Sequence, residues 1–251
     1  MFVSVIVLIY NEKANIEPQT LSILKSLEKH KIEGEILLVD DGSTDSSPKI
    51  CDSLANRYPQ VRVIHHEKNK GRSFAIQTGF KEAKGDIIFI MDGDQQYEPD
   101  EIPKFIEKIK EGWDVVSGFR AHRADKKYRN LISSIYNWLL IKRKFKLDVK
   151  DQNSGFKAFK KEVVKNLGFE PAGYLGLHRF ILPLAKIKGY SITEIPISHY
   201  PRTSGKSYIK SYTVPFITLR DYLKFVKEHK REIKEARKKS TQNLYVRKME
   251  R

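Results

Sequence analysis

Two aspartates separated by one glycine stand directly after an apolar run in the first half of the chain. The run is 87–91, and the segment that follows it is Asp92-Gly93-Asp94-Gln95-Gln96. Carboxylates at this spacing can both turn toward one hard cation, while Gly93 relieves crowding and Gln96 offers a neutral oxygen. Oxygen ligands with open positions suit Mg²⁺ or Mn²⁺ that bridges a substrate diphosphate. The residues alone also allow a polar turn in which an aspartate caps a helix near Pro99.

Polar residues also follow two earlier apolar runs. Tyr10-Asn11-Glu12 ends the run 3–9, and Asp40-Asp41-Gly42-Ser43 ends the run 36–39. Ligands of parallel α/β sheets bind beyond the carboxyl ends of the strands, so we expect all three groups at one edge. Their convergence favours a functional role over a simple turn for the aspartate pair.

The apolar runs alternate with segments of helical spacing. We expect strands at 3–9, 36–39, 61–65, 87–91 and 114–117, and helices at 15–30, 46–58, 73–83 and 99–110. This alternation predicts a parallel α/β sheet with right-handed crossovers. The second half is less regular: we expect helices around 131–141, from 160 onward and near 177–187, a loop at 151–155, and a strand at 192–197.

Composition limits the classes of protein that need to be considered. The 251 residues carry 47 Lys and Arg against 31 Asp and Glu, a net charge of +16 that favours anionic partners. The single Cys51 excludes an intramolecular disulfide and a cysteine-based zinc site. No apolar run reaches the ~20 residues that a bilayer requires. Neither the Gly-x-Gly-x-x-Gly nor the Gly-x-x-x-x-Gly-Lys pattern occurs, which argues against the usual nicotinamide enzymes and nucleoside triphosphatases.

Six short motifs occur in order within residues 3–210. The first five are Tyr10-Asn11-Glu12, Val39-Asp40-Asp41-Gly42-Ser43, Asn69-Lys70-Gly71, Asp92-Gly93-Asp94-Gln95-Gln96 and Ser154-Gly155-Phe156-Lys157-Ala158-Phe159. The sixth is His178-Arg179-Phe180 followed by Arg202-Thr203-Ser204-Gly205-Lys206-Ser207. With the first five in the family's order, the chain resembles the family 2 glycosyltransferases, and within them the dolichyl-phosphate mannose synthase and polyprenyl-phosphate sugar transferase branch. Each motif is short, and their number and order make the resemblance specific; the sixth resembles the lipid-phosphate branch in particular.

The resemblance implies a GT-A fold: a Rossmann-like, mostly parallel sheet flanked by helices, here with a basic helical C-terminal tail. It also implies a GDP- or UDP-linked sugar donor and one divalent metal, Mg²⁺ or Mn²⁺. By position, the nucleotide sugar contacts Leu8, Tyr10, Glu12, Val39, Asp41, Asp92, Gly93, Gln96 and Lys206. The implied metal ligands are Asp92, Asp94 and Gln96, and the implied catalytic residues are Asp94, Arg120 and Arg202. On the acceptor side, the phosphate contacts are Arg129 and Ser133.

Three positions depart from the pattern of the family. Leu8 replaces the usual proline before the Tyr-Asn-Glu triplet, and Gly93 replaces the usual alanine between the two aspartates. Tyr208 stands where a lysine usually follows the Gly-x-Ser element, so Lys206 or Lys210 must make that contact, or the contact is missing.

The segment 173–183 bears on the acceptor. An alcohol acceptor needs a general base, usually a carboxylate within hydrogen-bond reach, whereas a phosphate monoester is already ionised. Relatives that use sugar acceptors place that carboxylate here, but the segment holds His178 and Arg179 and neither Asp nor Glu. We therefore expect a phosphate acceptor. His178 could be a base or a packed histidine, and Asp151 could orient an arginine or cap the turn before Ser154.

Together these observations predict an inverting transferase that moves a hexose, mannose or glucose, to a polyprenyl or dolichyl phosphate. Residues 1–118 would form the donor half, 119–211 the acceptor half, and 212–251 an amphipathic basic helix and tail. The segments 131–141 and 212–226 could pack as core helices or lie in a membrane interface. We expect a cytoplasmic chain, peripheral on the inner face of the cell membrane and touching anionic lipid headgroups. The alternatives are a glycosyltransferase with a soluble or polysaccharide acceptor, a silent scaffold, and a nucleic-acid-binding protein, which we do not expect.

Overall fold

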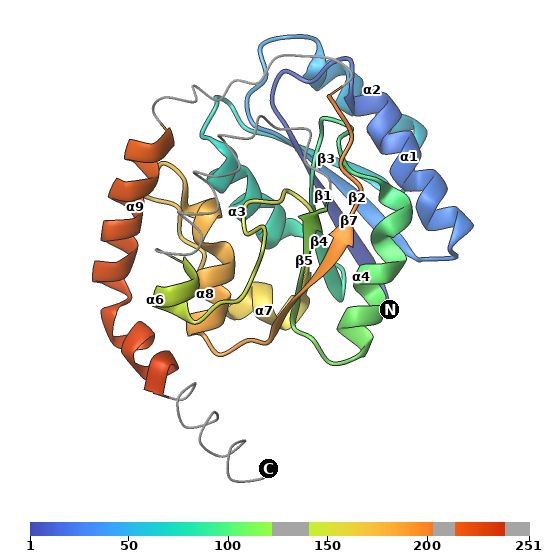
Figure 1. The fold of residues 1–251 in the computed structure, drawn as a ribbon. Coiled ribbons are helices and arrows are strands. Elements are labelled where there is room, and N and C mark those ends of the chain that lie inside the picture. Colours follow the sequence, from blue (N-terminus) through green and yellow to red (C-terminus); the bar gives the residue numbers. More distant parts are fainter. Residues whose placement is uncertain (122–140, 203–213, 239–251) are drawn as a thin grey trace.

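The computed structural model describes residues 1–121, 141–202 and 214–238. Within these residues one sheet has seven strands in the order β3-β2-β1-β4-β6-β5-β7 (Figure 1). Every strand is parallel to its neighbours except β6, which is antiparallel to both β4 and β5. The strands are β1 (Val3–Ile9), β2 (Gly34–Asp40), β3 (Val61–His65), β4 (Ile87–Asp92), β5 (Val115–Arg120), β6 (Lys157–Lys160) and β7 (Ile192–Ile197).

Helices cover both faces of this sheet. The hydrophobic cluster on one face joins the sheet to α1, α2 and α4, and the cluster on the other joins it to α3, α7, α8 and α9. The helices are α1 (Ile16–Lys29), α2 (Ser47–Arg57), α3 (Arg72–Glu82), α4 (Ile102–Lys110), α6 (Arg143–Phe145), α7 (Lys161–Asn166), α8 (Ile181–Ile187) and α9 (Val214–Glu228), with 3-10 turns η1 (Pro99–Glu101) and η3 (Leu177–Phe180).

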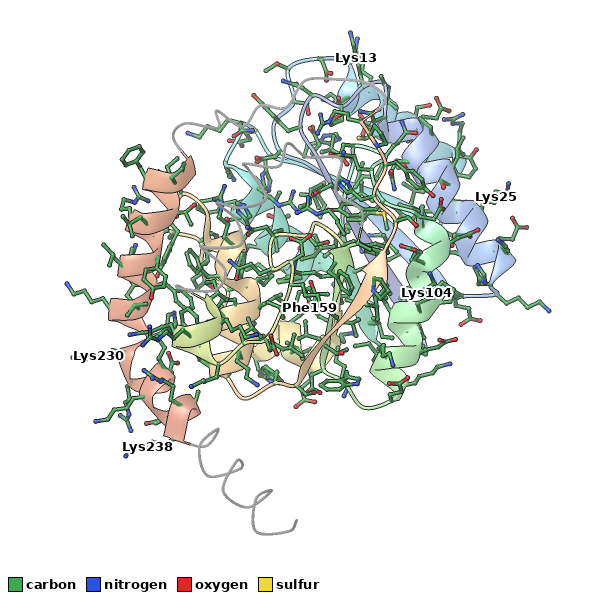
Figure 2. The ribbon with its side chains drawn as sticks, in the orientation of Figure 1. Lys13, Lys25, Lys104, Phe159, Lys230 and Lys238 are labelled. Carbon is green, nitrogen blue, oxygen red and sulfur yellow. The ribbon has the colours of Figure 1, made fainter. Side chains whose placement is uncertain are left out.

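Coverage on both faces explains why β1 is apolar except at Ser4, which is buried and donates to Glu35 Oε1 at 2.7 Å. Its apolar side chains alternate between the two cores: Val5 and Val7 belong to the cluster with α1, while Ile6 belongs to the cluster with α3. A strand buried on both sides favours apolar residues at successive positions, so it reads as a nearly continuous apolar run. In Figure 2 Phe159 of β6 lies in the interior, whereas the labelled lysines project from the periphery.

The expected fold class is confirmed, and the expected strands and helices agree with the structure to within about three residues at each end. The antiparallel β6 was not expected. Its sequence, Lys157-Ala158-Phe159-Lys160, is short and has lysines at both ends, so no strand pattern marks it. Pairing with β4 and β5, which lie far from it in the sequence, makes it a strand. The helix expected around 131–141 falls outside the described residues, apart from its last position.

Helix α9 runs along the outer edge of the molecule, beyond α6 and α8 (Figure 1). The fully buried ring of Phe225 stacks on Phe180, with ring centroids 5.1 Å apart and planes at 17°. Beside it, the buried carboxylate of Asp221 accepts hydrogen bonds from the backbone N–H groups of Leu175 (3.0 Å) and Gly176 (2.7 Å). These contacts fix α9 to the loop before η3. Among the described residues, no helix is long and apolar enough to cross a bilayer.

Replacing Phe225 with Ala should destabilise the fold strongly. The change removes a fully buried ring and leaves a cavity, so we expect the free energy of unfolding to fall by about 3–5 kcal/mol. Phe216 lies on the same helix and is 77% exposed, so Phe216→Ala should change the free energy of unfolding by no more than about 0.5 kcal/mol. Urea denaturation measures both; equal effects would contradict this packing of α9.

Candidate active site at the carboxyl edge of the sheet

Two nearly buried carboxylates meet where β1 and β4 end. The strands are neighbours, with Leu8 in register with Asp92, so the residues that follow them lie close together. The side chains of Glu12 and Asp94 are each 10% exposed. The guanidinium of Arg202 spans them: Nη1 donates to Glu12 Oε1 at 3.0 Å, and Nη2 donates to Asp94 Oδ2 at 2.9 Å. Glu12, Asp94 and Arg202, which lie far apart in the sequence, thus form a single cluster of charged side chains.

A short antiparallel pairing places Arg202 at this point. Tyr97 and His199 form an isolated antiparallel bridge. The next pair is Gln96 and Tyr200, in which the Tyr200 N–H donates to Gln96 O at 2.9 Å and Gln96 Nε2 donates to Tyr200 O at 3.0 Å. Continuing this register by two residues sets position 202 opposite position 94. Gln96, an expected metal ligand, therefore uses its amide nitrogen to hold the segment that carries Arg202.

Burial makes the carboxylates of this pair hold protons more readily. Burial, and then the neighbouring charge of Asp92, raise the pKa of Asp94 to about 6 against the opposing effect of Arg202. Burial also raises the pKa of Glu12, although Asn15 and Arg202 oppose the shift. Carboxylates in such surroundings are stabilised by a nearby cation, and in this structure that cation is Arg202.

Asp92 faces a different arginine. Arg72 at the start of α3 donates to Asp92 Oδ1, and the backbone at Gly155 packs against the other oxygen. A Cβ at position 155 would lie 2.0 Å from Asp92 Oδ2, so any other residue there would displace the Asp92 carboxylate. The two aspartates expected to share one cation are thus each paired with their own arginine.

The residues at this edge suit a divalent cation that takes only one or two of its ligands from the protein. No cluster of three or more His, Cys, Asp or Glu side chains suited to a metal occurs in the described part of the chain. Mg²⁺ is commonly bound through one or two carboxylates together with substrate phosphates and water. An ion bound through Asp94 Oδ2 would take the place that the positive charge of Arg202 occupies in this structure. The roles of Asp92, Asp94 and Gln96 as ligands stay predictions.

The residues expected around the nucleotide lie at the ends of β1 and β2. Leu8 and Val39 are buried in the core, and Gly93 packs closely on Leu8, since a Cβ there would lie 2.9 Å from Leu8 O. Asp41 binds the loop after β3: its carboxylate accepts from Lys70 N (2.9 Å) and Gly71 N (2.7 Å). The Asn69-Lys70-Gly71 motif is therefore attached to Asp41.

Asn11 and Tyr10 complete this wall of the site. Asn11 has a left-handed φ of 54°, and its Oδ1 accepts from Thr44 N at 2.8 Å. Its own N–H donates to Ser43 Oγ at 2.9 Å. Tyr10 is half-buried beside it. Asn11 thus joins the loops after β1 and β2, which carry two of the motifs.

On the acceptor side, Arg120 is held rigidly at the end of β5. Its Nε donates to Asp151 Oδ2 at 2.6 Å and its Nη2 donates to Asp151 Oδ1 at 3.0 Å, with side chains only 15% and 5% exposed. Asp151 therefore orients an arginine, one of the two roles left open by its position. Arg129, Ser133 and Lys206, together with Lys210, lie outside the described residues.

His178, in η3, contacts Ser73 in the first turn of α3. Its Nδ1 is 3.0 Å from Ser73 Oγ, which also accepts a hydrogen bond from its backbone N–H at 3.1 Å. Burial, followed by the nearby Arg179 and Arg72, lowers the pKa of His178 well below its ordinary value. The imidazole is therefore neutral, and it is a weak base.

Two basic residues of the site were not expected from the sequence. They are Arg72, which pairs with Asp92, and Lys157, whose buried ammonium donates to Ser154 O. Burial lowers the pKa of Lys157 to about 7. Both residues lie within or beside recognised motifs, but lysine and arginine are common, and their type and spacing give no separate signal.

Asp40, the neighbour of Asp41, pairs with His65, and the contribution of this pair to stability can be tested by varying the pH. Asp40 Oδ2 lies 2.8 Å from His65 Nδ1, and Asp52 Oδ1 lies 3.1 Å from His65 Nε2. Burial lowers the pKa of His65, but the hydrogen bonds to Asp40 and Asp52 outweigh burial and raise it overall. The folded chain thus favours the protonated ring. The resulting stabilisation is complete below about pH 6.5, the unfolded value, and is lost as pH rises through the folded pKa.

The substitution His65→Gln should therefore cost more stability in acid than in base. We expect the loss in free energy of unfolding relative to the unsubstituted chain to be larger at about pH 5.5 than at about pH 8.5. Urea denaturation at the two pH values measures the difference. A loss that is the same at both, or larger in base, would be inconsistent with the paired imidazolium.

Comparison with known proteins identifies the family of the chain. Residues 4–168 match the family described as Glycosyl transferase family 2. A dolichol-phosphate mannosyltransferase of Pyrococcus furiosus is 38% identical over 221 residues, which are 85% of this chain and 61% of that protein. An undecaprenyl-phosphate 4-deoxy-4-formamido-L-arabinose transferase of Shewanella sediminis is 34% identical over 214 residues, 82% of this chain and 61% of that protein. The chain thus spans about three-fifths of the length of these relatives.

Solved structures share the fold at lower identity. A mannosyltransferase from Pyrobaculum calidifontis, in complex with GDP-Man and Mn²⁺, has a TM-score of 0.61 at 21% identity and covers 82% of this chain and 58% of its own. Glucosyl-3-phosphoglycerate synthase from Mycobacterium tuberculosis, in complex with Mn²⁺, UDP and glucosyl-3-phosphoglycerate, has a TM-score of 0.58 at 21% identity. The match covers 80% of this chain and 72% of that one. These similarities confirm the GT-A fold. With residues 4–168 matched and the sheet arranged as expected, the chain belongs to glycosyl transferase family 2.

Proposed function

We propose that the chain is an inverting, metal-dependent hexosyltransferase that uses a GDP- or UDP-linked sugar, mannose or glucose, and a polyprenyl phosphate acceptor. The observation that carries the proposal is the carboxylate pair of Glu12 and Asp94 at the sheet edge, which Arg202 spans, with Arg72 bound to Asp92 and Arg120 bound to Asp151 at the end of β5. Carboxylates suit a metal, and arginines suit phosphates. The relative from Pyrococcus furiosus is named dolichol-phosphate mannosyltransferase, and the one from Shewanella sediminis is named undecaprenyl-phosphate 4-deoxy-4-formamido-L-arabinose transferase.

Each group has a definite task in this proposal. Asp94, with Asp92 and Gln96 beside it, would hold a Mg²⁺ or Mn²⁺ ion, and the chemistry that such an ion would supply is Lewis-acid stabilisation of the leaving diphosphate. The edge formed by Leu8, Tyr10, Glu12, Val39, Asp41 and Gly93 binds base and ribose. Arg120 is fixed by Asp151, so its positive charge is already in place and needs no reorganisation. Residues 1–118, together with Lys206, would thus bind the donor, and 119–211 would bind the acceptor, whose phosphate would meet Arg129 and Ser133.

The choice of a phosphate acceptor follows from the groups near η3. The segment 173–183 has no Asp or Glu. Asp221 enters from α9, but it is fully buried, and its carboxylate is bound to Leu175 N, Gly176 N and Arg220. His178 has a depressed pKa and a partner in Ser73. A nucleophile that is already ionised needs no proton acceptor, which suits these surroundings.

Transfer assays with two kinds of acceptor test this function. With Mn²⁺ and GDP-mannose or UDP-glucose, we expect product from a short-chain prenyl phosphate and none from sugar alcohols. Asp94→Asn should lower turnover by about 10²- to 10³-fold, since it removes negative charge beside the metal and diphosphate. Asp100→Asn is the matched control, because Asp100 is exposed and pairs with Lys29, away from this edge. Product from alcohols alone, or full turnover by Asp94→Asn, would refute the proposal.

We also propose that the chain acts as a peripheral protein on the cytoplasmic, inner face of the cell membrane. The outer face of α9 exposes Phe216 (77%), Leu219 (49%) and Leu223 (60%) at helical spacing. Exposed lysines, Lys227, Lys230 and Lys234, continue along the chain from this apolar group; Lys230 projects outward in Figure 2. An apolar stripe followed by basic residues complements an anionic lipid surface.

Vesicle sedimentation tests this surface. We expect binding to vesicles that contain phosphatidylglycerol, weaker binding to phosphatidylcholine alone, and about a tenfold loss in Leu223→Glu. Leu21→Glu is the control, since Leu21 is 38% exposed on α1 at the other side of the molecule (Figure 1). Equal losses in the two variants, or none in Leu223→Glu, would exclude α9 as the membrane surface.

A further inference from the structure

Arg202 occupies the oxygen that a metal at this site would use. Asp94 Oδ1 lies 3.4 Å from the Gln96 N–H, whereas Oδ2 is bound by Arg202 Nη2 at 2.9 Å. The same guanidinium also holds Glu12, at 3.0 Å, so it closes the space between the ends of β1 and β4. A divalent cation placed against Oδ2 would repel the guanidinium strongly, because the site is poorly solvated.

The backbone of Arg202 stays beside the site when its side chain leaves. The pairing of Gln96 with Tyr200 and of Tyr97 with His199 fixes the segment just before it. The side chain itself is 25% exposed, so it has room to turn toward solvent. A guanidinium displaced from two carboxylates carries its charge and its paired N–H donors to the nearest anion, and phosphate oxygens match that geometry.

We infer that Arg202 couples the two substrates: it neutralises Glu12 and Asp94 in the empty site, and the binding of metal and donor releases it to bind the acceptor's phosphate. This inference rests on the proposed function. Because Arg202 binds either the carboxylates or the phosphate, metal-nucleotide and acceptor must each raise the affinity of the other by the same factor. The acceptor phosphate then meets a complete site only when the donor is already bound.

Isothermal titration of Mn²⁺ into the protein saturated with GDP or UDP tests the first half of the inference. We expect Arg202→Gln to bind Mn²⁺ about tenfold more tightly than the unsubstituted chain, since no guanidinium competes. Arg202→Lys keeps the charge but cannot span both carboxylates, so it should bind about threefold more tightly. The control is Arg57→Gln, because Arg57 is an exposed residue of α2 that pairs with Glu17 of α1. Its affinity for Mn²⁺ should equal that of the unsubstituted chain. Equal or weaker Mn²⁺ binding by both Arg202 variants would overturn the inference.

The second half is tested by titrating a short prenyl phosphate with and without Mn²⁺ and nucleoside diphosphate. In the unsubstituted chain we expect the metal-nucleotide to raise the affinity at least fivefold, and in Arg202→Gln we expect that dependence to vanish. The same dependence in both proteins would overturn the coupling. If the unsubstituted chain binds no Mn²⁺ with either nucleotide, the proposed function itself fails; if it binds Mn²⁺ and the Arg202 variants match it, only the inference fails. Circular dichroism confirms that all variants fold.

Discussion

The pairing of Arg202 with Glu12 and Asp94 is the interaction on which this site depends. Two carboxylates from adjacent strands are almost withdrawn from water, and their charge requires a cation within hydrogen-bond distance. The fold supplies an arginine from a segment more than a hundred residues away in the sequence. It does so through the antiparallel continuation that begins at Tyr97 and His199. The same demand for positive charge suits the edge to a metal ion and to the phosphates that the ion accompanies.

The rest of the site is built to keep those charges in place. Asp92 is paired with Arg72 and lies against Gly155, and Arg120 is paired with Asp151, so each charged side chain at the edge has a fixed partner. Buried pairs of this kind add little to stability, because desolvation offsets their attraction. Their value lies in orientation: donors that are already in position need no rearrangement when an anion binds. The antiparallel β6 also helps to position these charges, because it begins at Lys157, directly after the loop that contains Asp151.

The local parts of this architecture follow from the sequence. Apolar runs bounded by polar turns predict β1 to β4 and the helices between them, because burial on both faces of a parallel sheet leaves a strong pattern. The order of short motifs predicts the family and points to Glu12, Asp41 and Asp94. What the sequence does not predict is pairing across long separations. Nothing local marks β6 as a strand, and no spacing connects Arg202 with Asp94 or Arg72 with Asp92. These contacts arise only when the sheet is assembled, and they decide which carboxylate meets which cation.

The central claim is that a metal ion and Arg202 use the same oxygen of Asp94. Crystals grown with Mn²⁺ and a nucleoside diphosphate, with diffraction recorded at the manganese absorption edge, test it directly. The account predicts an anomalous peak at bonding distance from Asp94 Oδ2, with the guanidinium of Arg202 turned away from Glu12 and Asp94. Manganese bound elsewhere, or Arg202 still spanning both carboxylates beside a bound ion, would contradict it.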